Sequence, residues 1–294
     1  MIRIRRCIQL LFVVLLLCML SVGGTTDERL RIATTTSLYD TKLLDVLESR
    51  FEEEHGVALD IISGGTGFAL EQGRRGDVDL LLVHDKDRER EFIDDGYGTE
   101  RRCFAYNYFY IVGPAGDPAG IRGRNASEAF RRIADAGEKN PNVQFVSRGD
   151  NSGTHARERM LWKSAGIEPS GRWYLESGQG MGATLIMADE KRAYTLTDMS
   201  TYMAFAGNLS LVPLVTESDE LLNVYAAIPV SASKHLDLAE RFVEFLLSQE
   251  GQEIIAGYGK DIYGRALFYP AAGHCTEIGC NATECPGEMV SAFG

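Results

Sequence analysis

Three polar turns carry the side chains best suited to binding chemistry in this sequence. Residues 34–37 read TTTS, residues 64–67 read GGTG, and residues 147–155 read SRGDNSGTH. Each turn lies between an expected strand and an expected helix. The first N–H groups of a helix bind anions, hydroxyl groups add donors, and glycine lets the backbone approach a ligand closely. These neutral donors, with Arg148 as the single guanidinium, predict that the turns hold a small tetrahedral oxyanion without reacting with it.

Two further segments could contribute to this anion site or indicate a different function. Residues 178–184 (GQGMGAT) lead into an expected helix, and residues 195–198 (TLTD) end an expected strand. The first segment lacks the spacing and strand context of a dinucleotide fingerprint, which disfavours NAD. An exported hydrolase that uses Ser152 and His155 is the alternative from another functional class, although the G-x-S-x-G spacing is absent. We interpret His155 and Glu158 as a capping-turn histidine and a solvated acid rather than metal ligands.

Regular alternation of strands and helices would position these turns. Apolar runs predict strands at 29–33, 57–62, 78–83, 104–112, 143–146, 193–197, 211–215 and 224–228. Helical periodicity predicts helices at 41–55, 64–72, 86–95, 127–138, 154–164, 181–190 and 235–247. This alternation indicates an α/β fold with mainly parallel sheets, in which ligands bind at the carboxyl ends of strands.

No linker rich in Pro, Gly or Ser divides the chain, so two lobes require strands that cross between them. The strands at 104–112 and 224–228 are the natural crossings. We therefore expect lobe 1 to contain residues 29–108 and 227–270, and lobe 2 to contain residues 109–226. Residues 271–294 form a Cys-rich C-terminal tail. A single continuous doubly wound sheet is the alternative.

The N-terminus and the overall charge bear on location and partners. Arg3, Arg5 and Arg6 precede the apolar run 10–20, which is typical of a signal peptide; we place it at residues 1–24. The protein is then extracytoplasmic, in the periplasm or at the cell surface, with an uncleaved anchor or a lipid on Cys18 as alternatives. The formal charge of −12 disfavours nucleic acid and anionic membranes as partners. The hydrophobic fraction of 45% excludes wholesale disorder.

Four cysteines remain after the leader: Cys103, Cys275, Cys280 and Cys285. In an oxidising compartment they can form two disulfides, with three possible pairings. A metal clip that also uses His274 is the alternative, but its ligand spacing is wider than in structural zinc sites. We expect no metal and no cofactor.

The motifs of this sequence, taken together and in order, resemble those of one known protein family. Five motifs resemble, in order, the tungstate-binding proteins of bacterial and archaeal ABC importers: TTTS at 34–37, GDVD at 76–79 before LLLVH, SRGDNSGTH at 147–155, GQGMG at 178–182 and YTLTD at 194–198. The resemblance extends from about Arg31 to Tyr269. It implies an α/β, two-lobed periplasmic-binding-protein fold of type II with the ligand cleft between the lobes. It also implies a non-enzymatic, monomeric receptor that passes tungstate to a membrane permease, with molybdate as the alternative ligand.

The resemblance also implies which residues contact the oxyanion: Thr35, Thr36, Ser37, Thr66, Arg148, Ser152, Gly153, Thr154 and Thr197. The sequence departs from the family pattern after YTLTD, where Met199 and Ser200 stand in place of Arg-Gly. The tail from His274 onward lies outside the resemblance.

Overall fold

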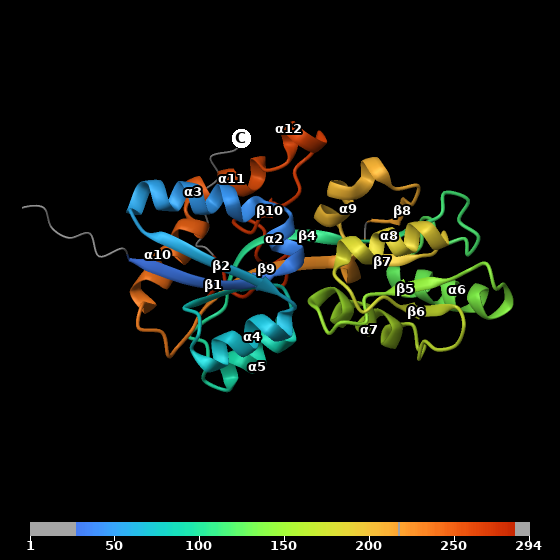
Figure 1. Ribbon diagram of the computed structural model, residues 1–294, viewed down its shortest axis with the longest axis horizontal. Coiled ribbons are helices and arrows are strands. Elements are labelled where there is room, and N and C mark those ends of the chain that lie inside the picture. Colours follow the sequence, from blue (N-terminus) through green and yellow to red (C-terminus); the bar gives the residue numbers. More distant parts are fainter. Residues whose placement is uncertain (1–27, 217, 286–294) are drawn as a thin grey trace, which may run out of the picture.

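Strand β4 (Arg102–Gly113) belongs to both halves of the molecule. The computed structural model describes residues 28–216 and 218–285. The first part of β4 pairs with β9 (Leu222–Pro229), and its last part pairs with β7 (Thr195–Asp198) and β8 (Val212–Val215). In Figure 1, β4 and β9 run side by side between a left-hand and a right-hand lobe. The expected two-lobed α/β fold is confirmed, with β4 and β9 as the crossing strands.

Lobe 1 is a sheet covered on both faces. Strand β1 (Arg29–Thr35) runs parallel to its two neighbours, the edge strand β2 (Ala58–Gly64) and β3 (Leu80–Val83). One face packs against α3 (Leu43–His55), α10 (Leu236–Leu247) and α11 (Gln249–Gly257). The other face packs against α4 (Thr66–Arg75) and α5 (Lys86–Asp94), below the sheet in Figure 1. This double cover explains why all four residues of β3 are apolar.

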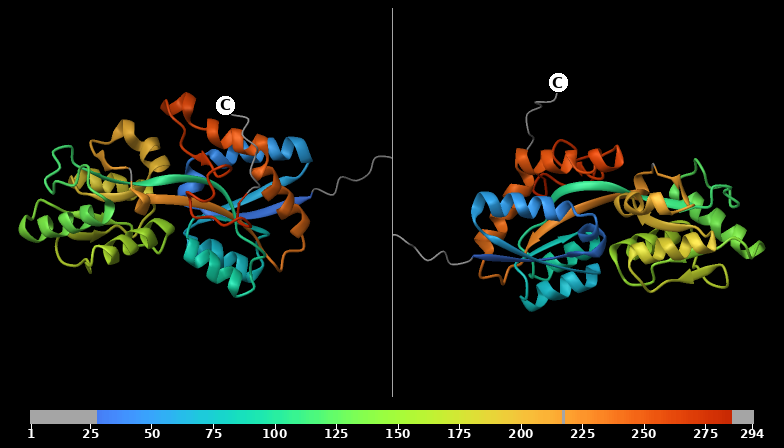
Figure 2. Two further views of the ribbon diagram at one scale, coloured as in Figure 1. Left: turned by 180° about the vertical axis from the view of Figure 1, so that it is seen from behind. Right: turned by 45° about the horizontal axis from the view of Figure 1, so that its top comes forward.

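Lobe 2 has the same layered arrangement on a smaller scale. Its strands are β7, β8, β5 (Phe145–Ser147) and β6 (Tyr174–Glu176). Helices α6 (Ala126–Lys139) and α7 (Gly153–Ser164) share one core, in which Phe130 and Trp162 pack edge to face with ring centroids 4.3 Å apart. Helices α8 (Met181–Lys191) and α9 (Met199–Phe205) share the other. The two further views in Figure 2 show the same two bodies joined by the crossing strands.

The expectation of mainly parallel sheets is wrong. Strand β1 is parallel to both its neighbours and β5 is parallel to β6, but β9 is antiparallel to β3, and β4 is antiparallel to every strand that it pairs with. The reason is the crossing itself. Strand β4 carries the chain out to lobe 2 and β9 carries it back, so two adjacent crossing strands must run in opposite directions.

The disulfide Cys103–Cys280 ties the tail to lobe 1, and a second disulfide, Cys275–Cys285, closes a loop within the tail. The short strand β10 (Tyr269–Pro270) pairs with β4, and the following residues bury Ile278 against it. The short helices α2 (Thr36–Asp40) and α12 (Lys260–Tyr263) and the 3₁₀ turns Ala206–Asn208 and Asp219–Leu221 complete the described chain.

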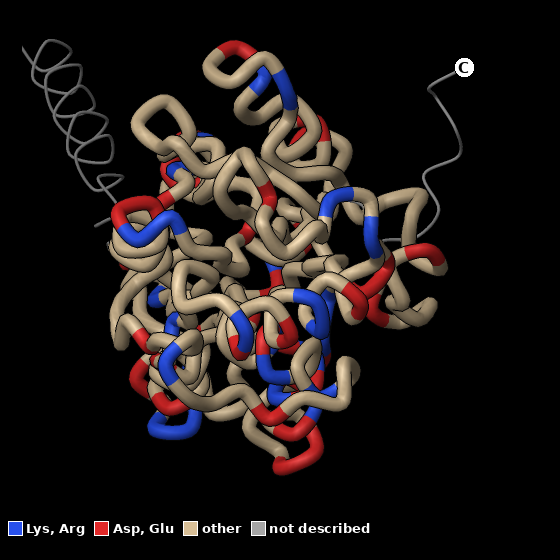
Figure 3. Tube along the Cα trace, turned by 90° about the vertical axis from the view of Figure 1, so that its right-hand side faces the viewer, with Lys and Arg blue, Asp and Glu red and all other residues tan. Residues whose placement is uncertain are grey.

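The surface carries both signs of charge. Figure 3 shows basic and acidic segments interspersed along the chain on the side that it presents. Across residues 28–216 and 218–285, no helix has the length and apolar character needed to span a bilayer. The expected signal peptide, at residues 1–24, lies outside the described residues.

Candidate functional site

The TTTS turn forms the junction between β1 and α2. Thr35 ends the strand and caps the helix, with its Oγ1 accepting a hydrogen bond from the Leu38 N–H over 3.4 Å. Thr36 is half-buried at the first helical position, and Ser37 is buried behind it. Strand β1 therefore delivers the turn to the end of lobe 1 that faces lobe 2.

Two longer helices begin at the other polar turns. Thr66 is the first residue of α4, after the extended Gly65. Gly153 and Thr154 begin α7, which Ser152 caps by accepting from the His155 N–H over 3.2 Å. The hydroxyls of Thr66 and Thr154 are buried and have no hydrogen-bond partner among the described residues. An unpartnered buried hydroxyl costs about 1–3 kcal/mol, which points to a ligand as its partner.

The start of α7 meets lobe 1 at Gly153. A methyl group placed on Gly153 would lie 2.9 Å from His84 Cε1 and 3.1 Å from Thr66 Oγ1. Arg88 Nη1 donates to the carbonyl of Asn151 over 3.1 Å, which adds a second contact across the lobes. A cavity of about 410 Å³ lies beside this contact, lined by Gly67, Arg88, Asn151, His155, Ala156 and Arg159.

Arg148 brings positive charge to this junction. Its side chain is buried and donates through Nε and Nη2 to Asp150 Oδ2, the former over 3.0 Å. The charge also acts on lobe 1. Burial raises the pKa of the Asp40 carboxyl at the end of α2, the charges of Lys42 and Arg148 lower it, and that of Asp198 raises it. Arg148 is thus electrostatically coupled to the helix that begins at the TTTS turn.

Thr197 differs from the other candidate residues. It is buried in β7, where its hydroxyl donates to the carbonyl of Asp198 over 3.1 Å. Asp198 caps α9 and accepts from Ser200 Oγ and from the backbone and hydroxyl of Thr201. Ser200, one of the two residues that depart from the family pattern, is thus buried in a local network, and Met199 is buried in the core.

The sequence reasoning missed His84 and Asn223. His84 follows β3, with its Nε2 3.3 Å from Ser37 Oγ and its Nδ1 2.9 Å from Asn223 Oδ1. Burial lowers the pKa of His84 to about 4, although the Asp198 charge opposes this shift, so the ring is neutral near pH 7. A histidine directly after a wholly apolar strand was a usable signal for this position. Asn223, within crossing strand β9, gave none.

Glu158 is not the solvated acid that the sequence suggested. It is buried under the Arg148 turn and accepts from Ser147 Oγ, Trp162 Nε1 and Tyr174 Oη over 2.7, 3.0 and 2.8 Å. Burial raises its pKa to about 7, although these hydrogen bonds lower it. The helical spacing placed Glu158 correctly on α7, but two of its three partners, Ser147 of β5 and Tyr174 of β6, come from outside that helix.

The geometry does not favour a hydrolase. The Ser152 hydroxyl accepts from the backbone of His155, whereas His155 Nδ1 accepts from the Asn151 N–H over 3.0 Å. The His155 ring therefore acts as a capping group, and it makes no recorded hydrogen bond to the Ser152 hydroxyl that it would have to deprotonate.

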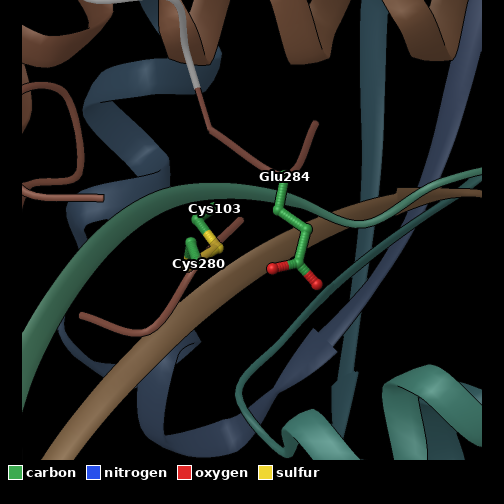
Figure 4. Close-up of side chains that lie close together, drawn as sticks. All are labelled: Cys103, Cys280 and Glu284. Atoms are coloured by element: carbon green, nitrogen blue, oxygen red, sulfur yellow. A yellow bond between two sulfur atoms is a disulfide. The ribbon is translucent and has the colours of Figure 1, made fainter. Parts of the chain in front are cut away.

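Nor does the one cluster of metal-ligand types within the described segments form a cation site. Cys103, Cys280 and Glu284 lie together, but their two sulfurs are joined in a disulfide (Figure 4). Arg101, buried beside them, lies 3.7 Å from the Glu284 carboxylate and donates to Glu89 over 2.6 Å. A bonded sulfur pair and a neighbouring guanidinium leave no thiolate for a metal.

Comparisons with known proteins agree with this architecture. A family model described as a PBP superfamily domain matches residues 21–250. A Haloferax volcanii protein, named provisionally as an ABC transporter anion-binding protein, is 48% identical over 262 residues, covering 86% of this chain and 74% of the relative. The tungstate-binding protein TupA of Peptoclostridium acidaminophilum is 41% identical over 245 residues, covering 82% and 85%.

A solved structure extends the likeness to three dimensions. The tungstate ABC transporter protein from Geobacter sulfurreducens shares 45% identity and superposes with a TM-score of 0.71, covering 79% of this chain and 99% of its own. A relative above 40% identity that aligns over four-fifths of the chain shares its fold and ancestry. On this evidence the chain belongs to the PBP superfamily and, within it, to the family of solute-binding proteins that includes the tungstate-binding proteins.

Proposed function

We propose that this protein captures tungstate outside the cytoplasm and delivers it to the membrane permease of an ABC importer. Relatives named for tungstate binding support the ligand. The observation that carries the proposal is the pair of buried hydroxyls, Thr66 on lobe 1 and Thr154 on lobe 2, which lack partners at the point where the lobes meet. Donors without acceptors are the arrangement expected of a site for an anion that only accepts hydrogen bonds.

Capture then follows from the two-lobed architecture. The starts of α2 and α4 belong to lobe 1, and the start of α7 and Arg148 belong to lobe 2. An oxyanion that contacts both sets favours the state in which the lobes touch, so binding shifts the population toward closure. We assign the contacts to Thr35, Thr36, Ser37, Thr66, Arg148, Ser152, Gly153 and Thr154, with Thr197 in a supporting position.

The test is calorimetric titration of the purified protein with tungstate, molybdate, sulfate and phosphate. Binding of tungstate in preference to sulfate and phosphate supports the proposal, and a molybdate response as strong as that of tungstate widens the ligand to both. Heat from sulfate or phosphate alone overturns it. Arg148→Ala removes charge-assisted hydrogen bonds and should weaken tungstate binding at least about tenfold. Arg75→Ala, an exposed position on α4, is the matched control and should bind as the wild type does.

A further inference from the structure

A chain of buried hydrogen bonds connects the crossing strands to the TTTS turn. Asn107 on β4 and Asn223 on β9 are partners in the antiparallel ladder. Asn223 Nδ2 donates to Asn107 Oδ1 over 2.9 Å, and Asn223 Oδ1 lies 2.9 Å from His84 Nδ1. His84 Nε2 continues the chain to Ser37 Oγ at 3.3 Å, and both asparagines are fully buried.

The direction of donation along this chain is fixed at its inner end. Asn107 Nδ2 lies 3.4 Å from the Leu267 carbonyl, which can only accept. Asn107 Oδ1 must therefore accept from Asn223 Nδ2, and this leaves Asn223 Oδ1 as the acceptor that faces His84. Because burial lowers the pKa of His84 to about 4, the neutral ring carries one hydrogen, and that hydrogen is on Nδ1. His84 Nε2 consequently carries no hydrogen, and its lone pair can only accept a hydrogen bond.

The lone pair determines where the hydroxyl hydrogens of the turn point. Ser37 must donate to His84 Nε2, because that nitrogen has no hydrogen of its own. Thr35 Oγ1 lies 3.3 Å from Ser37 Oγ and is left to donate to it. Without an anion, both hydroxyl hydrogens therefore point along the turn toward His84 and are not available to a ligand.

We propose that His84 is a positioning residue of the anion site and that it binds a proton when the anion binds. A hydrogen on Nε2 then donates to Ser37 Oγ, and the hydroxyl hydrogens of Ser37 and Thr35 turn toward the oxyanion. The proton comes from solvent, and no other bond forms or breaks. This inference rests on the proposed function, because it assumes that an oxyanion occupies the site of which Ser37 is a member.

Charged groups on lobe 2 act on the ring in opposite directions. Asp198 on lobe 2 favours the charged ring, while Arg148 and Arg157 on the same lobe oppose it. The Tyr225 ring packs at a centroid distance of 4.9 Å and carries no charge at neutral pH. A dianion held between Ser37 and the start of α7 adds negative charge next to His84 and shifts this balance toward the imidazolium.

Nitrogen NMR of the wild-type protein, with ¹⁵N-labelled histidine, tests both halves of the inference. Without ligand, His84 should show the neutral Nδ1–H tautomer, and with saturating tungstate it should show the imidazolium. An Nε2–H tautomer in the free protein, or a neutral ring in the complex, overturns the inference. This measurement needs no variant and does not depend on how any substitution folds.

Calorimetry at pH 7 in buffers of different ionisation enthalpy measures how many protons the protein takes up when tungstate binds. The wild type should take up about one proton per tungstate. His84→Asn retains a donor toward Asn223 but has no titrating ring, so its uptake should fall to near zero. Glu158→Gln is the matched control, because Glu158 also titrates near neutrality, and its uptake should match the wild type. Tungstate binding without proton uptake refutes the role of His84 and leaves the proposed function standing. If no oxyanion gives heat, the proposed function itself is refuted.

Discussion

Replacing Gly153 with alanine should weaken anion binding while leaving each lobe intact. Gly153 is the first residue of α7, where alanine is conformationally unstrained. The added methyl would meet His84 Cε1 at 2.9 Å, Thr66 Oγ1 at 3.1 Å and His84 Nδ1 at 3.2 Å, all on the other lobe. His84 is held through both ring nitrogens and cannot swing aside without breaking a buried hydrogen bond. The steric cost therefore falls only on the state in which the lobes touch.

Overpacking of this kind costs about 1–3 kcal/mol, which corresponds to an affinity loss of about 5- to 150-fold. Isothermal calorimetry with tungstate measures the loss, and thermal unfolding without ligand checks that the fold is retained. Gly65→Ala is the matched control, since Gly65 is an extended residue of the same site with nothing within 4 Å of the new methyl. Wild-type affinity in Gly153→Ala, or an equal loss in Gly65→Ala, would refute the reasoning.

Three other substitutions test separate features. Thr66→Val should stabilise the ligand-free protein by about 1 kcal/mol, because it removes an unpartnered hydroxyl, yet weaken tungstate binding; a parallel fall in thermal stability and affinity contradicts this. The pKa of Glu158 is raised from 4.5 to about 7, so its protonated form favours the fold and about 3 kcal/mol is lost as pH rises through this window. Glu158→Gln should flatten that slope in melting curves between pH 4.5 and 7, and an unchanged slope rejects the assignment. Replacing Cys103 and Cys280 together with alanine should cost about 2–5 kcal/mol of unfolding free energy in denaturant titrations, and an unchanged midpoint would show that the tail contributes nothing.

Local patterns predicted the elements well where one feature dominated. Helical periodicity predicted a helix at 41–55, and α3 lies within that range with Leu44, Leu47 and Phe51 buried on it. An apolar run predicted a strand at 78–83, and the structure places β3 at Leu80–Val83 with both faces packed against helices. Helical period and apolar continuity are local properties, so the sequence displays them directly.

What the sequence could not show depends on residues that are distant along the chain. The pattern of β4 is mostly apolar and does not reveal that its neighbours run antiparallel. Glu158 looked solvated because its burial depends on Trp162 across one helical turn and on Tyr174 from another strand. The cysteine pairing stayed open for the same reason, since Cys103 and Cys280 are 177 residues apart.

The sequence could not predict the contact between His84 and the start of α7, because these residues are also distant along the chain. Hydroxyl-rich and glycine-rich turns are visible as motifs, but the polar groups behind them are single residues within strands. Asn107 and Asn223 become a pair only through the register of β4 and β9. Such a network can be identified only once the pairing of β4 with β9 is known, because no sequence motif indicates it.

Strand β4 changes its ladder partner between Tyr108, which pairs with β9, and Phe109, which pairs with β7. A rotation of the backbone at that step leaves the hydrogen bonds of each sheet in place, since neither ladder spans the joint. Opening then breaks no sheet, and its free-energy cost comes from the contacts that the cargo and the facing loops make. The receptor can therefore release its ion by giving up those contacts alone, without any part of it unfolding.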